Sequence, residues 1–78
     1  MYEIFTYGKF EVDPSNEEAF VEAWSEFASW ASEQPGAATI RLFRDVRNPG
    51  RFVSLGQWDD ADAVRNWKSS TEFKERRP

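Results

Sequence analysis

The pattern of apolar and polar positions begins with a strand. Residues 2–12 are rich in aromatic and β-branched side chains and stop at Asp13-Pro14, which predicts a long first strand. Phe5 and Tyr7 fall on one face of it. The opposite face carries Ile4, Thr6, Gly8 and Phe10. Because both faces are partly apolar, we expect this strand to be covered on both sides.

A helical pattern follows. Ser15 and Glu18 have the spacing of a capping box, in which the two side chains bond each other's backbone amides. Pro35-Gly36 is the stop signal. At about 100° per residue, one face of the segment gathers Phe20, Ala23, Trp24, Phe27 and Ala31, with Trp30 at its flank. The pattern predicts an amphipathic helix that lies on a sheet.

Two more strands are predicted over residues 38–47 and 51–58. Between them, Pro49-Gly50 is a turn signal, since proline presets φ and glycine accepts a positive φ. The two strands therefore form a hairpin.

A second, shorter helix is predicted after Trp58. Asp59 and Asp62 have the spacing of an N-cap and the third helical position. The apolar side consists of Ala63, Val64 and Trp67. Ser69 with Glu72 is read as a fresh cap for a last turn that carries Phe73.

The order strand, helix, strand, strand, helix is an α+β pattern, the ferredoxin-like βαββαβ plan without its last strand. The missing strand would pair with the first one, whose edge is therefore open. Either the chain is truncated or a partner covers that edge. With 78 residues, we expect one domain over residues 1–78.

Composition favours association with a second copy. A chain of 78 residues buries only about 60 to 65% of its unfolded surface, and without cysteine no disulfide can compensate. Four Trp, seven Phe and two Tyr supply the aromatic area that cores, interfaces and pockets use. We expect a homodimer that encloses a small-molecule pocket.

Several function classes are excluded or disfavoured. Without His or Cys, most nucleophilic triads, imidazole bases and thiolate metal sites cannot form. A net charge of -4 argues against nucleic acid, and Arg51-Phe52-Val53-Ser54-Leu55-Gly56 lacks the base-stacking pattern of RNA-recognition modules. No apolar run reaches the roughly 18 residues of a membrane span, and no signal sequence is evident, so we place the chain in the cytoplasm.

Charged clusters have a simple structural explanation beside a functional one. One reading of the acidic cluster is a set of oxygen ligands for a hard cation. The other is a helix N-cap with acidic residues favoured by the helix dipole. The cluster consists of Asp59, Asp60 and Asp62. Four arginines cluster around the hairpin: Arg41, Arg44, Arg47 and Arg51. They could bind an anionic ligand, or they could simply form a solvent-exposed strand face. Tryptophans are usually core residues, which is the alternative for Trp24, Trp58 and Trp67.

The order and spacing of several short segments resemble the antibiotic biosynthesis monooxygenase family over most of the chain. They are Pro35-Gly36, Leu42-Phe43-Arg44-Asp45, Asn48-Pro49, Phe52-Val53-Ser54, Trp58 and Trp67-Lys68-Ser69-Ser70-Thr71-Glu72-Phe73. The resemblance implies a dimeric ferredoxin-like α+β barrel in which two sheets meet face to face. Each subunit would then have a pocket between its sheet and its helices.

The resemblance also separates two branches of that family. The haem-degrading branch has an Asn on the first strand, a Trp on the second helix and a His ten residues later. Trp67 matches the Trp, but Gly8 stands near the Asn position and Arg77 stands at the His position. Haem degradation by that route is therefore not expected.

The sequence thus predicts a cofactor-independent monooxygenase that acts on a planar aromatic or polyketide-like molecule, with no metal. Trp67 would hold the ring by stacking, and an oxyanion would accept a hydrogen bond from Tyr7, Ser54 or Arg41. Trp24 is a further pocket candidate. The alternative is a non-catalytic binder or structural dimer on the same fold, because fold alone does not carry function.

Overall fold

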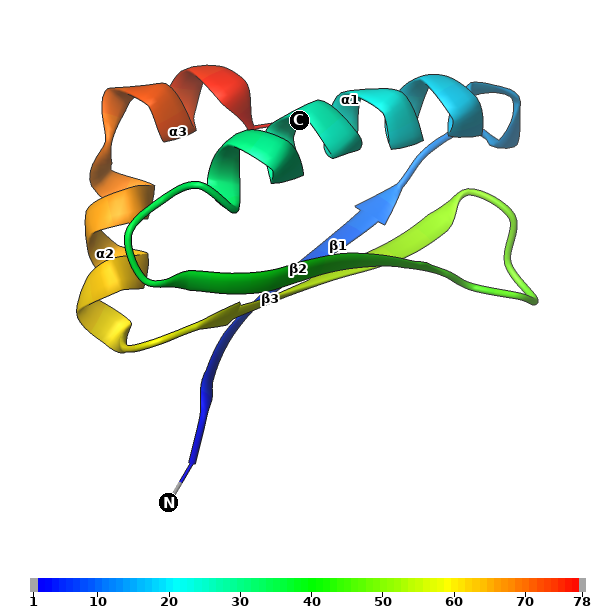
Figure 1. Ribbon diagram of the computed structural model, residues 1–78. Helices are drawn as coiled ribbons and strands as arrows, with labels where there is room; N and C mark the ends of the chain where they lie inside the picture. The colour runs from blue at the N-terminus through cyan, green and yellow to red at the C-terminus, as the bar shows by residue number, and fades with distance from the viewer. Residues whose placement is uncertain (1, 78) are drawn as a thin grey trace.

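The computed structural model describes residues 2–77, and Figure 1 shows a layer of helices above a twisted sheet. In chain order the elements are β1 (Ile4–Glu11), the short 3-10 helix η1 (Pro14–Asn16), α1 (Glu17–Ala31), β2 (Ala37–Arg44), β3 (Arg51–Trp58), α2 (Ala61–Ser69) and α3 (Thr71–Arg76). No helix in this part of the chain is long and apolar enough to cross a membrane.

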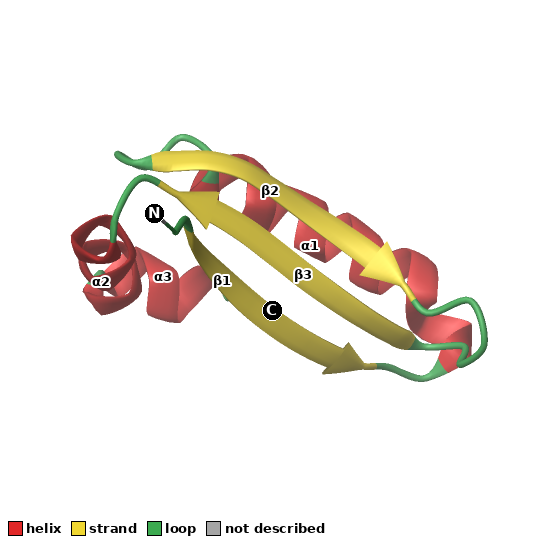
Figure 2. Ribbon diagram, turned by 90° about the horizontal axis from the view of Figure 1, so that it is seen from below, coloured by secondary structure: helices red, strands yellow, loops and turns green. Residues whose placement is uncertain are grey.

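The sheet has three strands in the order β1-β3-β2. β3 pairs antiparallel with both neighbours, so β1 and β2 run parallel on either side of it. This is the ferredoxin-like arrangement, and the predicted α+β fold class is confirmed. Figure 2 shows that the helices cover one face of the sheet only. β1 is an edge strand, as the strand order predicted.

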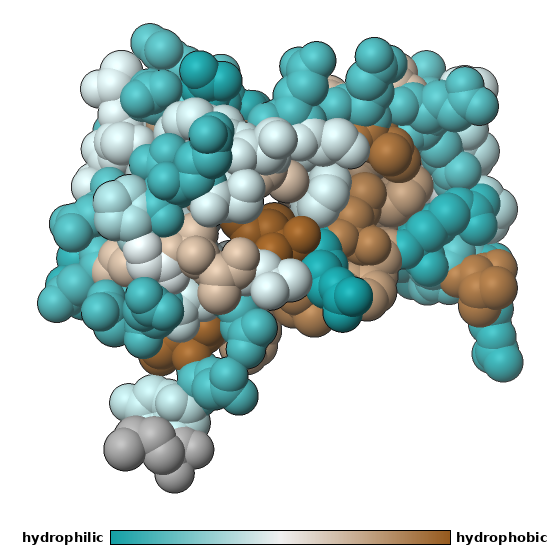
Figure 3. Space-filling model, viewed as in Figure 1, coloured by the Kyte–Doolittle hydropathy of each residue, from teal (hydrophilic) through white to brown (hydrophobic). Residues whose placement is uncertain are grey.

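The helix-facing side of the sheet holds the core. Burial alternates along β1, and on β3 the side chains of Phe52 and Trp58 are buried. One cluster joins the layers: Ala31 at the end of α1, Trp58 at the end of β3 and Trp67 on α2. In Figure 3, hydrophobic residues gather between the helix layer and the sheet, and hydrophilic residues cover the outer side of α1.

Glu17 ties the start of α1 to the β2–β3 turn. Its two carboxylate oxygens each accept a 3.1 Å hydrogen bond from Nε of Arg44, and one also accepts from the amide of Gly50. Gly50 has φ 85°, and a Cβ there would collide with the carbonyl oxygen of Val12. Only glycine fits this crossing of β1 and the turn.

The predicted helix caps were wrong in detail. Ser15 does not cap α1; its hydroxyl donates to Oδ1 of Asp13 over 2.6 Å, because proline at position 14 starts a 3-10 turn that Asp13 caps. Asp60, not Asp59, caps α2 by accepting from the amide of Ala63. Likewise Ser70, not Ser69, caps α3. Each neighbouring residue has the same capping chemistry, so sequence alone could not choose between them.

Some boundaries also differ. α1 ends at Ala31, and Ser32 is its C-cap, four residues before Pro35-Gly36. Gly36 does have φ 85°, but it lies in the connection to β2. β2 covers Ala37–Arg44 instead of 38–47, because the carboxylate of Asp45 accepts from the amides of Arg47 and Asn48 and turns the chain.

Candidate functional site

A cavity of about 220 Å³ lies between the helices and β1. Four of the predicted pocket residues line it: Tyr7, Trp24, Ser54 and Trp67. The rest of its lining comes from β1, α1, α2 and the C-terminal segment: Thr6, Gly8, Phe10, Phe27, Lys68, Phe73 and Arg77. Aromatic residues thus make up much of the lining.

Trp67 is both a core residue and a wall of the cavity. It is 8% exposed, and its ring centroid lies 4.7 Å from those of Trp58 and Phe73. Its indole Nε1 is buried and has no hydrogen-bond partner among the described residues. A buried N–H usually has a partner, so this indole is an exception.

Trp24 holds Ser54 in place. The indole Nε1 of Trp24, on α1, donates a 3.2 Å hydrogen bond to Oγ of Ser54, in the middle of β3. The hydroxyl of Ser54 thus serves as an acceptor toward the helix, and its own proton has no acceptor among residues 2–77. Thr6 is different, because its Oγ1 accepts from Nε1 of Trp58 over 3.2 Å and also donates to the carbonyl oxygen of Gly56 over 3.5 Å.

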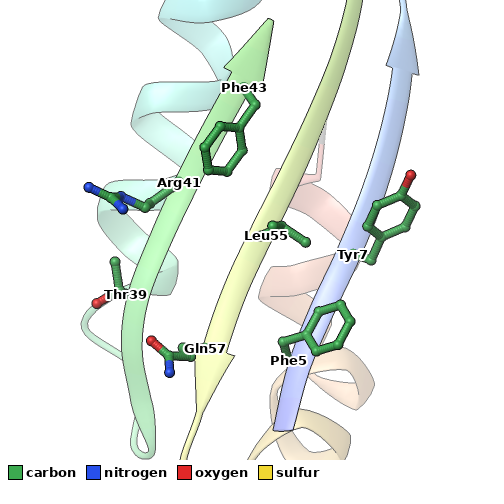
Figure 4. Close-up of a pocket in the computed structure, with 7 residues that line it drawn as sticks. All are labelled: Phe5, Tyr7, Thr39, Arg41, Phe43, Leu55 and Gln57. Carbon is green, nitrogen blue, oxygen red and sulfur yellow. The ribbon is translucent and has the colours of Figure 1, made fainter. Parts of the chain in front are cut away.

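Tyr7 and Arg41 lie on the other face of the sheet. Both line a shallow groove on that face, together with Phe5, Thr39, Phe43, Leu55 and Gln57. In Figure 4 these side chains rise from all three strands, and the Arg41 guanidinium points away from the sheet beyond β2. The strand pleat places odd-numbered residues of β1 and β2 there.

The predicted site residues are thus divided by the sheet. Trp67, Trp24 and Ser54 meet in the cavity, while the side chains of Tyr7 and Arg41 belong to the outer groove, although Tyr7 also touches the cavity rim. Sequence reasoning missed Lys68 and Phe73 as cavity residues. The helical spacing from Val64 to Lys68 was the available signal for Lys68.

The positions compared with the haem-degrading branch do come together. Gly8, Trp67 and Arg77 all line the cavity. A Cβ on Gly8 would lie 3.1 Å from a ring carbon of Phe10, so the bare backbone at this position leaves the Phe10 ring room to lie across β1. Neither Gly8 nor Arg77 carries a side chain that can ligate haem iron in the manner of His or Cys.

Several charges of the two clusters take part in a helix cap or in ion pairs. Asp60 caps α2 and Asp62 pairs with Arg65 at 2.6 Å; no group of metal ligands is present among the described residues. Around the hairpin, Arg44 pairs with Glu17 and Arg51 with Glu11, each at 3.1 Å. These charges therefore serve the surface and the turn.

Carboxyl groups with shifted pKa values lie away from the cavity. Hydrogen bonds from Ser15 lower the pKa of Asp13. The Arg44 guanidinium and the Gly50 amide lower that of Glu17. Asn48 and the amide of Arg47 lower that of Asp45. All three stabilise loops or turns, so none is a candidate for acid or base chemistry in the cavity.

A sequence profile of the antibiotic biosynthesis monooxygenase family matches residues 4–77. The uncharacterized protein YqjZ of Bacillus subtilis (strain 168) is 30% identical over 63 residues, which are 81% of this chain and 54% of the relative. The chain thus spans about half the length of that relative.

Solved structures share the fold. SnoaB, a cofactor-independent oxygenase from Streptomyces nogalater, superposes with a TM-score of 0.82 at 23% identity, over 97% of this chain and 76% of that one. A conserved protein from Methanosarcina mazei Go1 gives a TM-score of 0.83 at 21% identity, over 96% and 74% of the two chains. At these identities the likeness concerns architecture.

Proposed function

The chain belongs to the antibiotic biosynthesis monooxygenase family, and on this premise we propose that it is a cofactor-independent monooxygenase for a planar aromatic or polyketide-like small molecule. The observation that supports the proposal is the cavity beneath Trp67, walled by aromatic rings and reached by the Ser54 hydroxyl. The SnoaB structure, described as a cofactor-independent oxygenase, is consistent with this activity.

The reaction would use the substrate's own electrons. An ionised ring carbon next to a phenol or ketone gives one electron to dioxygen, and the substrate radical and superoxide combine to form one C–O bond. The protonated hydroperoxide then loses water and leaves a carbonyl. One oxygen atom stays in the product, and the other leaves as water with the two hydrogens that the carbon carried.

The protein's part is to bind, orient and desolvate the substrate. Trp67 and Phe73, whose rings pack at 72° with centroids 4.7 Å apart, would hold the aromatic plane. Ser54, fixed by Trp24, would donate to the oxyanion. No carboxylate lines the cavity among residues 2–77, so the proton would leave to water.

We further propose that the functional unit is a homodimer joined through the outer face of the sheet. Phe5, Tyr7 and Phe43 are 62%, 52% and 46% exposed on that face. Figure 2 shows that none of the helices in residues 2–77 covers it. A second copy would bury these rings and cover β1 on both sides, as its two-sided apolar pattern predicts. Large exposed apolar patches commonly mark interfaces.

The test is turnover of a hydroxylated aromatic polyketide by chelator-treated protein, with and without dioxygen. Quinone formation in air that stops under anaerobic conditions supports an oxygenase. Equal rates with protein and with buffer alone contradict it.

A non-catalytic binder remains the second candidate, and the lack of any carboxylate, His or Cys in the cavity lining favours it. The same experiment separates the two. A binder takes up the aromatic probe in calorimetry and leaves its oxidation rate in air unchanged.

A further inference from the structure

The polar side chains of the cavity include several hydrogen-bond donors. Lys68 on α2 and Arg77 after α3 line it, and both side chains can only donate. The Trp67 indole N–H is buried without a partner, and the Ser54 hydroxyl keeps its proton free while its oxygen accepts from Trp24. Thr6 is already engaged with Trp58.

The two charged side chains in the cavity lining of residues 2–77 are both cations. The chain as a whole has a net charge of -4, yet within residues 2–77 the cavity lining includes the cations of Lys68 and Arg77 and no carboxylate. Four other cations form ion pairs with acids: Arg44, Arg51, Arg65 and Arg76. The remaining cations lie outside the cavity lining: Lys9, Arg41, Arg47 and Lys74. Within residues 2–77, no acidic side chain forms an ion pair with Lys68 or Arg77.

We propose that the cavity selects an aromatic acid, with the ring held against Trp67 and a carboxylate at the mouth between Lys68 and Arg77. This inference rests on the proposed function, because it names the substrate class of the same site. A guanidinium presents a fork of donors that matches a carboxylate, and the ammonium of Lys68 adds a second charge. The carboxylate of the ligand supplies acceptors for these two cations.

The volume sets the size of the ring system. About 220 Å³ is below the roughly 300 to 1,000 Å³ of pockets for drug-sized ligands. A bicyclic aromatic acid therefore suits the cavity better than a larger fused system. The same cations also favour a negatively charged substrate during oxygenation, since they stabilise the anion that reacts with dioxygen.

The test is isothermal titration calorimetry of the protein with naphthoate and with its neutral isostere naphthamide. Because hydrogen bonds to charged groups are about twice as strong as neutral ones, naphthoate is expected to bind about tenfold more tightly. In the double variant Lys68→Gln with Arg77→Gln, this preference should fall to about twofold or less. The matched control, Lys74→Gln with Arg47→Gln, removes the same charge from residues outside the cavity lining and should keep it.

The possible outcomes distinguish a missing preference for acids from a missing aromatic-binding site. Equal binding of the acid and the amide by the unaltered protein overturns the acid preference and leaves an aromatic site intact. Loss of the preference in the control as well as in the cavity variant also overturns it, since net charge alone would then explain the effect. If neither compound binds, this proposal falls together with the proposed aromatic-binding function.

Discussion

The indole Nε1 of Trp24 donates a 3.2 Å hydrogen bond to Oγ of Ser54, and this contact joins the middle of α1 to the central strand at the wall of the cavity. Trp24 is only 8% exposed. The bond therefore has two effects: it satisfies a buried donor, and it leaves the serine proton free to donate elsewhere.

Replacing Ser54 with Ala should destabilise the protein and weaken ligand binding. The buried Trp24 N–H loses its acceptor, which costs about 1 to 3 kcal/mol. Urea unfolding measures this loss, and calorimetry with naphthoate measures binding. Ser54→Thr keeps a hydroxyl and serves as the control; if it behaves like Ser54→Ala in both measurements, the hydrogen bond is not the cause.

Substitutions of Trp67 should separate its core role from its role at the cavity. Its ring contacts those of Phe27, Trp58 and Phe73, so Trp67→Ala should cost about 3 to 5 kcal/mol, a large share of a small domain's stability. Trp67→Phe keeps an aromatic ring and should fold nearly normally while aromatic binding falls. Unchanged binding in folded Trp67→Phe would make Trp67 a structural residue only.

Glu17 should make stability depend on acid pH. Its pKa is lowered in the folded state by Arg44 and the Gly50 amide from the ordinary value of 4.5. A lowered folded-state pKa stabilises the protein above the unfolded-state value, and the stabilisation is lost as the pH falls below 4.5 through the folded-state value. Glu17→Gln should therefore be less stable than the parent at pH 7 and approach it in acid. Urea midpoints across this range test the effect; a constant difference would contradict it.

The outer face should control association. Phe43→Asp places a charge among the rings of the groove and should convert a dimer into a monomer, because an unpaired charge is costly to bury. Sedimentation velocity at micromolar concentration measures this. Val46→Asp is the control, since Val46 is 88% exposed and lies in the turn after β2. A monomeric parent protein would contradict the proposed dimer.

The spacing of apolar residues was sufficient to predict the order of helices and strands and their layers. The apolar faces of residues 2–12 and 51–58 and the helical repeat from Phe20 to Ala31 define the layers, and β3 has the predicted bounds. Neighbouring polar residues compete to cap a helix, and the sequence alone could not predict which of them does so. Ser15 was expected to cap α1, but Asp13 caps the 3-10 turn η1 that precedes it. Asp60 caps α2 in place of the adjacent Asp59, since both offer equivalent oxygens.

Strand parity explains how the candidate residues divide between the two faces of the sheet. Ser54 faces the helices with Trp24 and Trp67, whereas Tyr7 has the same parity as Phe5 and therefore faces outward. Lys68 and Arg77 were not expected as binding residues. Helical spacing from Val64 could have indicated Lys68, but the position of Arg77 depends on how α3 turns back over β1, which is tertiary geometry without a local signal. The single domain over residues 1–78 and the homodimer stay predictions.

The most direct test of the proposed monooxygenase activity follows the oxygen atoms. Chelator-treated, desalted protein would be incubated with a hydroxylated aromatic polyketide under isotopically labelled dioxygen in ordinary water, and the quinone product would be analysed by mass spectrometry before exchange. A cofactor-independent monooxygenase places one labelled oxygen atom in each product molecule and needs no added flavin or metal. A product without label, or turnover that appears only when a flavin or metal is supplied, would contradict cofactor-independent monooxygenase activity.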